Sequence, residues 1–462
     1  MTRTLMPFAA AALLSGCASL DPAYVRPAAP VPTGFPVGDP YRADAPALPD
    51  FTHRDVFRDV RLQTLIAQAL QNNRDLRIAA ANIASARAQV RISRGAQLPQ
   101  LDAAAGVDVT PRRSADGDIN GVRVGGSASL LPSFEVDLFG RLASLTRADQ
   151  ARLLATTAAE RGVRVALIGD IAEAWLTYAA DSDLLAIAEN TVRSAERTAA
   201  LTEARLKGGV APRTDLLQAQ QILETARADL ASQKALRSQD INLLQLLVGA
   251  PIDPSLLAPS LDQAASSVAA LPAGLDSRVL LRRPDIIEAE YRLRAANAEI
   301  GAARAALFPS ISLTGLLGLA SNTLTNLFTG GALAFSAAAD ARQSIFSGGA
   351  GRARVSQRQA ERDAAVASYE QAIQVAFRET ADALADKGTL GDRVAANRRN
   401  FGAASETLRL VQARYREGID PFLTTLDAQR SAYAAERNLV AGRLAEARNA
   451  VTLYRVLGGD GR

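Results

Sequence analysis

Apolar residues recur along this chain with two different periods, and each period predicts a different element. Between 61 and 94 they recur at helical spacing, which predicts one helix. Pro99 ends that pattern, and from 101 to 109 apolar residues alternate with polar or small ones, which predicts a strand. The alternating apolar positions are Leu101, Ala103, Ala105, Val107 and Val109.

Three further stretches carry the period of two. They span 122–130, 311–317 and, more faintly, 327–341. Strands of about ten residues that are apolar on one face and small or polar on the other suit a transmembrane barrel. A pair of hairpins packed on a soluble core is the alternative that this pattern leaves open.

Two long stretches, 141–207 and 349–416, contain no proline and predict very long helices. At 1.5 Å per residue each would be about 100 Å long, so these helices must pack on one another. The helices predicted to follow them carry apolar residues at multiples of seven, a spacing that favours coiled-coil packing. These residues are Leu216, Leu223, Leu230 and Leu244 in one helix, and Leu426, Tyr433, Val440, Ala447 and Tyr454 in the other.

The chain contains an internal duplication. The segment 204–220, in which Gly and Pro mark a turn between two helical patterns, aligns without a gap with 413–429, about 209 residues later. Further matches follow in the same order: 73–76 with 283–286, 98–99 with 308–309, and 247–249 with 456–458. Each half therefore reads as a helix, a strand pair, a very long helix, a turn and a return helix.

The composition argues against several classes of function. The 462 residues carry a formal net charge of only +4, and Arg is interleaved with Asp and Glu along the helices, which argues against nucleic-acid binding. With one His (His53) and one Cys (Cys17), the chain has too few residues of the types that a catalytic triad or a His/Cys metal site needs. We therefore expect no enzyme activity, no metal and no bound cofactor.

The N-terminus has the features of an exported lipoprotein. Residues 1–16 contain Arg3 and an apolar run from 8 to 14, which is typical of a signal peptide and too short to span a bilayer. Leu14-Ser15-Gly16-Cys17 resembles the bacterial lipoprotein box, which implies cleavage before Cys17 and a diacylglycerol on its thiol. Because the next residue is not Asp, the same resemblance implies the outer membrane as destination. A plain signal peptide with a chance Cys is the alternative.

The segment 21–49 contains eight prolines and little periodicity, so it predicts an extended strap, with a disordered tether as the alternative.

The number of strands predicts an assembly. One chain supplies four strands, and a sheet of four cannot close around its own edges. Two chains would give an eight-stranded barrel filled by its own side chains, whereas three would give a barrel with a lumen. The long helices are charged along their length, so we expect them to extend a trimeric barrel into the periplasm.

Six motifs, spread in order over most of the chain, carry a resemblance to a known family. They are Leu14-Ser15-Gly16-Cys17, Phe134-Glu135-Val136-Asp137-Leu138-Phe139-Gly140-Arg141, Leu281-Arg282-Arg283-Pro284-Asp285-Ile286, Ala295-Ala296-Asn297-Ala298-Glu299-Ile300-Gly301, Phe308-Pro309-Ser310-Ile311-Ser312-Leu313-Thr314-Gly315, and Leu426-Asp427-Ala428-Gln429-Arg430. The chain resembles the TolC-like outer-membrane efflux protein family, and within it the lipidated, drug-efflux branch.

This resemblance implies a mixed, mainly α fold. A homotrimer would form a twelve-stranded barrel in the outer membrane, continued by a periplasmic tunnel of twelve helices in coiled-coil packing. The channel would passively conduct drugs or other small solutes outward, docked to a periplasmic adaptor (a membrane fusion protein) and an inner-membrane pump of the RND type. A duct for type I protein secretion is the alternative with the same fold. A lipid-anchored periplasmic enzyme or structural coiled coil is a more distant one.

We expect the following division of the chain. Residues 1–16 form the signal peptide, 17–60 the lipidated strap, 61–250 the first repeat, 251–280 an equatorial linker, 281–458 the second repeat and 459–462 a C-terminal tail.

Two groups of residues are candidates for function. Gly208, Gly209 and Gly418 lie in the two predicted helix turns, where short side chains and exposed backbone suit docking of an adaptor. The alternative is that these glycines only close the turns.

Leu423, Asp427 and Arg430 lie early in the last helix, at positions that the resemblance assigns to the periplasmic aperture. The first repeat has Gln218 and Gln221 where the second has Asp427 and Arg430, so the charges occur in one repeat only. The alternative for Asp427 is ordinary stabilisation at a helix N-terminus.

Overall fold

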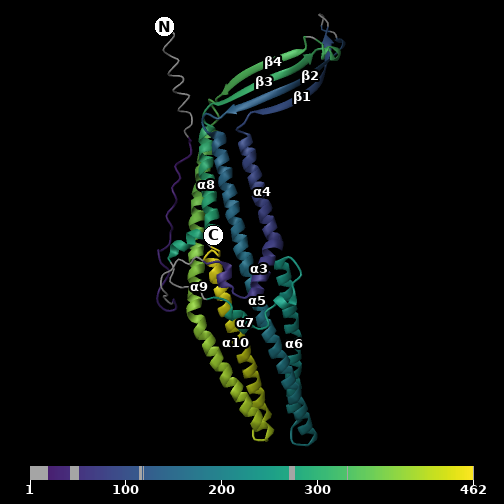
Figure 1. Cartoon of the computed structure of the whole chain (residues 1–462), viewed down its shortest axis with the longest axis vertical. Coiled ribbons are helices and arrows are strands. Elements are labelled where there is room, and N and C mark those ends of the chain that lie inside the picture. The colour runs from purple at the N-terminus through teal and green to yellow at the C-terminus, as the bar shows by residue number, and fades with distance from the viewer. Residues whose placement is uncertain are drawn as a thin grey trace. The chain divides into compact units, whose positions relative to one another are not determined.

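The computed structural model describes residues 19–41, 51–113, 117, 119–269, 276–329 and 331–460. The chain divides into two compact units. One contains 81–157, 288–370 and the chain up to 28, and the other contains 29–80, 158–287 and 371–462. Long helices and one four-stranded sheet make up the described residues (Figure 1).

The order of the elements repeats, as the duplication predicts. The helices are α2 (His53–Val56), α3 (Val60–Asn72), α4 (Arg74–Gly95), α5 (Arg141–Lys207), α6 (Arg213–Val248), α7 (Leu261–Ser266), α8 (Pro284–Ala305), α9 (Ala350–Arg416) and α10 (Phe422–Val456), with short 3-10 turns η1 (Pro254–Leu256), η2 (Ser277–Arg282) and η3 (Leu324–Asn326). The helices α5 and α9 have 67 residues each and coincide with the two proline-free stretches. No helix of the described residues is long and apolar enough to cross a membrane.

The sheet joins the two repeats. Its strands are β1 (Gln100–Arg113), β2 (Ile119–Val136), β3 (Ser310–Ser321) and β4 (Leu333–Arg342), all antiparallel and in the order β1-β2-β3-β4. The junction between repeats is the pairing of β2 with β3, which runs from Gly126 opposite Ser321 to Val136 opposite Ile311. Predicted apolar positions such as Val107 and Val122 are 65% and 69% exposed, so most of this face of the sheet is uncovered among the described residues.

The predicted strand 327–341 was wrong at its start. Residues 327–329 belong to the loop after the 3-10 turn η3, and β4 begins only at Leu333. Gly331 has a φ of +108°, outside the β region, and lies in the turn that precedes β4.

The predicted single helix 61–94 is two helices, because the chain leaves the helical conformation at Asn73. The Asn73 side-chain oxygen accepts hydrogen bonds from the backbone N–H of Asp75 and Leu76, at 2.8 and 3.1 Å, and so caps α4. Its amide nitrogen donates to the carbonyl of Leu247 at 2.8 Å. The corresponding residue of the second repeat, Arg283, donates to the carbonyl of Val456 at 3.0 Å.

The second unit holds the larger apolar core. Trp175 of α5 is fully buried, and its indole nitrogen donates to the carbonyl of Leu256 at 3.0 Å, which satisfies its one polar atom. The other largest buried side chains are Tyr369, Tyr454, Phe57, Leu62, Leu65, Ile66, Ile168, Ile171, Leu176, Leu244 and Leu261, all but Tyr369 in the second unit.

The first unit packs its helices through small residues. Ala148 and Ala151 of α5 meet Ala295 and Ala298 of α8 in a buried cluster, where the missing side-chain bulk lets the backbones approach closely.

The described part of the N-terminal segment is extended and makes specific contacts in the first unit. The Asp21 carboxylate accepts hydrogen bonds from Ser144 and Arg147, each at 2.7 Å. The Arg26 guanidinium contacts the buried carboxylate of Glu290 at 2.5 Å and donates to the Tyr369 hydroxyl at 3.2 Å.

Candidate functional site

The turn between α5 and α6 is fixed by backbone hydrogen bonds. The N–H of Val210 donates to the carbonyl of Arg205, and the N–H of Gly209 to that of Leu206, each at 3.0 Å. This is a Schellman motif, which requires a left-handed residue after the helix end, and Gly209 supplies it with a φ of +74°.

The turn between α9 and α10 has the same backbone. Ile419 donates to the carbonyl of Arg414 at 2.9 Å and Gly418 to that of Tyr415 at 3.0 Å, with a φ of +76° at Gly418. Gly208, in contrast, has no positive φ, and the second repeat has Glu417 in its place. The turn therefore requires Gly209 and Gly418 but not Gly208.

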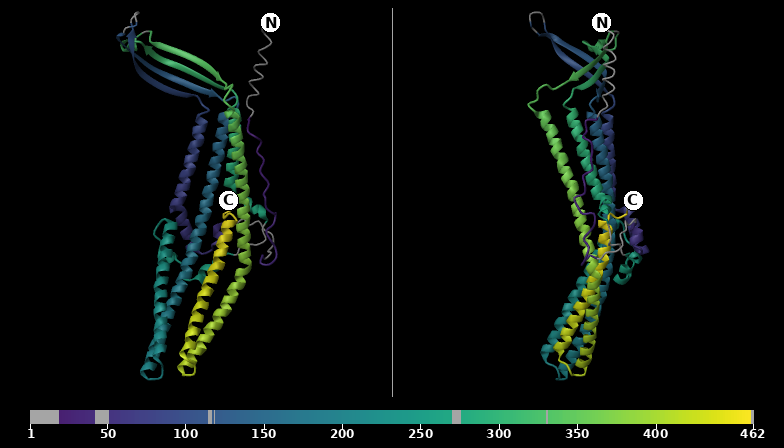
Figure 2. Two further views of the ribbon diagram at one scale, coloured as in Figure 1. Left: turned by 180° about the vertical axis from the view of Figure 1, so that it is seen from behind. Right: turned by 90° about the vertical axis from the view of Figure 1, so that its left-hand side faces the viewer.

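Arg205 links the two turns, which lie side by side in the second unit (Figure 2). Its guanidinium donates to the backbone carbonyls of Tyr415 and Arg416, both at 2.9 Å, and lies 4.4 Å from the centre of the Tyr415 ring. It thereby bonds two carbonyls at the end of α9, where the helix supplies no further N–H four residues on; the Tyr415 carbonyl also accepts from Gly418. Tyr415 in turn packs with Phe422 and Ala219 in a small buried cluster.

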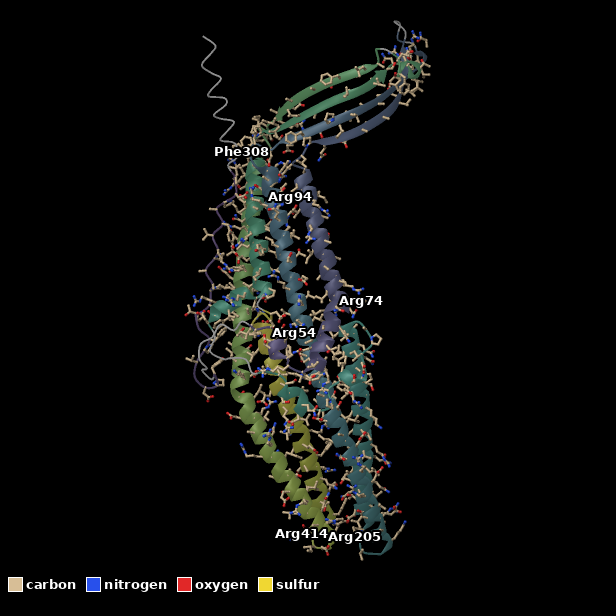
Figure 3. The ribbon with its side chains drawn as sticks, viewed as in Figure 1. Arg54, Arg74, Arg94, Arg205, Phe308 and Arg414 are labelled. Carbon is tan, nitrogen blue, oxygen red and sulfur yellow. The ribbon has the colours of Figure 1, made fainter. Side chains whose placement is uncertain are left out.

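Arg414, the counterpart of Arg205 in the second repeat, makes a different contact. It forms two hydrogen bonds, at 2.8 and 2.9 Å, with the carboxylate of Asp420 in its own turn. These bonds hold the pKa of the Asp420 carboxyl below its usual value. The first repeat has Ala211 at the position of Asp420, so Arg205 has no acid there to hold it. Figure 3 labels both arginines at the turns.

The turns also present a cavity and two exposed apolar side chains. The cavity has a volume of about 450 Å³, and its lining includes Arg205, Asp215 and Tyr415. Val210 and Ile419 occupy the same position in the two repeats, and they are 76% and 61% exposed. A polar recess flanked by apolar side chains is a surface suited to contact with another protein.

The three predicted aperture residues share one exposed face of α10. Leu423 is 57% exposed, and Asp427 and Arg430 are exposed as well. The opposite face, with Thr425 and Leu426, is buried against the rest of the unit. In the described part of the chain neither Asp427 nor Arg430 has an ion-pair partner, so both side chains are available to a neighbouring molecule.

Cys17 lies outside the described residues. The structure brings the predicted glycines together at one end of the second unit. Sequence reasoning missed Arg205, Val210 and Ile419; the repeat itself was a signal for the last two, because both copies have a β-branched apolar residue after the turn glycine. Among the described residues, no group of three or more His, Cys, Asp or Glu side chains is placed to hold a metal.

The chain matches known proteins over nearly its full length. The model of the outer membrane efflux protein family matches residues 65–250 and again 275–459. The solvent efflux pump outer membrane protein SrpC of Pseudomonas putida is 39% identical, over 98% of this chain and 97% of that protein. The outer membrane protein OprJ of Pseudomonas aeruginosa is 39% identical, over 97% and 94% of the two chains.

A solved structure agrees with the fold. The open-state MtrE outer membrane channel of Neisseria gonorrhoeae is 34% identical and superposes with a TM-score of 0.83, covering 96% of this chain and 99% of that one. The chain therefore belongs to the outer membrane efflux protein family, a family of channels located in the outer membrane. It is the outer-membrane channel component of an efflux system.

Proposed function

We propose that three copies of this chain assemble into a channel that passively conducts drugs or other small solutes outward. The observation that carries the proposal is the four-stranded sheet. Most of its apolar face is exposed, and its two outer edges, one on β1 and one on β4, are unpaired among the described residues. Unpaired strand edges are costly in lipid, and pairing β4 of one copy with β1 of the next would remove them. Three copies would give twelve strands around a lumen.

The proposal includes an aperture lined by the exposed face of α10. Threefold symmetry would place three copies each of Leu423, Asp427 and Arg430 around one axis. Contacts of Asp427 and Arg430 with neighbouring helices would hold the aperture closed. Each exposed pair contributes only about 0–1 kcal/mol. A docked partner would therefore need only a small difference in binding free energy between the closed and open states to open the aperture.

The partners proposed are a periplasmic adaptor and an inner-membrane pump of the RND type. The adaptor would contact the two helix turns, where Gly209 and Gly418 border open space and where Val210 and Ile419 present apolar side chains; Gly208 adds a second residue without a side chain. The duct for type I protein secretion remains the second candidate. Export of a small dye from cells, measured with and without the channel, separates the two, since a duct dedicated to polypeptides would leave dye export unchanged.

A lipid on Cys17 is the remaining part of the proposal. Mass spectrometry of the mature N-terminus should find a chain that starts at Cys17 with three acyl chains. Because the barrel would itself anchor the protein, Cys17→Ser should lower yield or assembly more than it lowers export. An unmodified Cys17, or cleavage elsewhere, contradicts lipidation.

One experiment tests the channel itself. The membrane-extracted protein should migrate as a heat-modifiable trimer and conduct ions in planar bilayers. A monomer without conductance after mild extraction would contradict the proposed function.

A further inference from the structure

A second cavity lies in the second unit, among α5, α6, α9 and α10. Its volume is about 350 Å³, within the range of small-molecule sites. All four helices contribute apolar side chains to the lining, among them Ile187, Ala195, Ile222, Ala226, Phe401 and Leu408. This lining would bury the apolar part of a ligand.

One charged group of the lining has no partner. The Glu436 carboxylate of α10 is half-buried, and in the described part of the chain it forms no hydrogen bond or ion pair. Burial alone raises the pKa of this carboxyl above its usual value. A half-buried carboxylate without a counter-charge is unfavourable, and a bound cation would relieve that cost.

The other charged groups that line the cavity leave this acid uncompensated. Asp229 of α6 is already engaged, since it accepts a hydrogen bond from the Tyr433 hydroxyl at 3.1 Å and lies 3.8 Å from the Arg437 guanidinium. Arg430 is the third charged residue of the lining and is exposed. The lining residues from α5 and α9 are uncharged.

The acid is also specific to one repeat. The residue that corresponds to Glu436 in the first repeat is Arg227, which has the opposite charge. Arg227 lies on the surface and pairs with Glu196 and Glu224. The fold that the two repeats share therefore does not require an acid at this position.

We propose that this cavity binds a monovalent organic cation with an aromatic or branched apolar body. Glu436 would face the cationic centre, and the rings of Phe401 and Tyr433 would contact the same centre or the apolar body. The site lies between helices, away from the two turns, and shares Arg430 with the aperture face; its ligand would brace α10 against α5 and α6.

Binding to the purified full-length protein in a neutral detergent tests the site, with two probes of the same shape and opposite charge. We expect tetraphenylphosphonium to bind by equilibrium dialysis and to raise the melting temperature, and tetraphenylborate to do neither. Glu436→Gln should weaken phosphonium binding about tenfold, because it removes the charge and keeps the shape. Glu446→Gln, an exposed acid of the same helix outside the cavity, should leave binding unchanged.

A second variant guards against misfolding of the first. Ser194→Phe places a ring in the cavity and leaves Glu436 in place, so it should weaken binding of tetraphenylphosphonium at least as much as Glu436→Gln does. Binding should weaken as the pH falls and Glu436 becomes protonated, with Asp229 and Arg430 as the other charges facing the cavity. Equal binding of the two probes, equal binding by the parent and Glu436→Gln, or no binding at all would overturn the proposal. None of these outcomes bears on conductance, which tests the proposed channel separately.

Discussion

The turn between α5 and α6 and the turn between α9 and α10 have the same backbone conformation, but their side chains make different contacts. Both turns have the same pair of Schellman hydrogen bonds and a glycine with nearly the same positive φ. Yet Arg205 reaches across to the other hairpin, whereas Arg414 is held by Asp420 in its own turn. The duplication has thus kept the bonds that shape the turn, while the side chains have diverged to suit different neighbours.

The same division appears elsewhere in the repeats. Asn73 and Arg283 make the same bond, to the carbonyls of Leu247 and Val456, with different side chains. Asp240 of α6 corresponds to Asn449 of α10, which donates to the carbonyl of Ala383 at 2.9 Å. Differences between equivalent positions of the two repeats therefore indicate where the two hairpins make different contacts.

Substitution of the turn glycines should have the largest effect. Gly209→Leu and Gly418→Leu force a side chain into the left-handed region, at a cost of about 1–2 kcal/mol, and also add bulk at the docking surface. We expect export of a dye to fall strongly in cells that carry either variant, while trimers still assemble. Gly208→Leu adds the same bulk without a positive φ and separates the two causes. Export at the parental level in all three variants contradicts a docking role.

Substitution at the aperture face should have the next largest effect. Asp427→Gln with Arg430→Gln gives the second repeat the residues of the first, Gln218 and Gln221. Loss of three copies of each charge should raise single-channel conductance in planar bilayers clearly and lower the preference for cations. Gln221→Ala serves as the control. If conductance and selectivity match the parent, these residues form a solvated helix face and the aperture lies elsewhere.

The two arginines should differ in their effect on stability. Arg205→Gln removes two hydrogen bonds to backbone carbonyls and a contact with the Tyr415 ring, and should lower the free energy of unfolding by about 1–2 kcal/mol. Arg414→Gln removes an exposed ion pair within one turn and should have a smaller effect. Thermal unfolding of the two variants in parallel measures the difference. Equal losses would mean that Arg205 does not join the hairpins in solution.

The smallest effect concerns Asp240 and depends on pH. Burial and a hydrogen bond with Asp181 raise the pKa of Asp240 from 3.8 to about 7. A carboxyl with a raised pKa in the folded state stabilises the protein below about pH 4, and this contribution is lost as the pH rises through 7. Asp240→Asn, the residue of the second repeat, should therefore raise the melting temperature at pH 8 more than at pH 5. An equal change at both pH values contradicts the raised pKa.

The sequence allowed the long elements to be predicted because their signals are local. Absence of proline over 141–207 and the period of two over 101–109 can be read without any knowledge of neighbours. The break at Asn73 was missed because helical spacing continues through it, although the Asn side chain that caps α4 is a local signal. Its bond to the carbonyl of Leu247, 174 residues further along the chain, could not be predicted in this way. The bond from Arg205 to Tyr415 was missed for the same reason, since their separation of 210 residues is bridged only when the two hairpins pack together.

The contacts of the N-terminal segment have a consequence for the order of assembly. Tyr24 bonds to Glu290 and Arg26 to Tyr369, across 266 and 343 residues of chain. Contacts so distant in sequence form late, because both partners must first be synthesised and the intervening chain must be ordered at an entropic cost. We therefore expect that the end of the protein made first is fixed in place among the last. During export, this segment would remain extended without these contacts. It would be fixed in place only after the helices of both repeats have packed together.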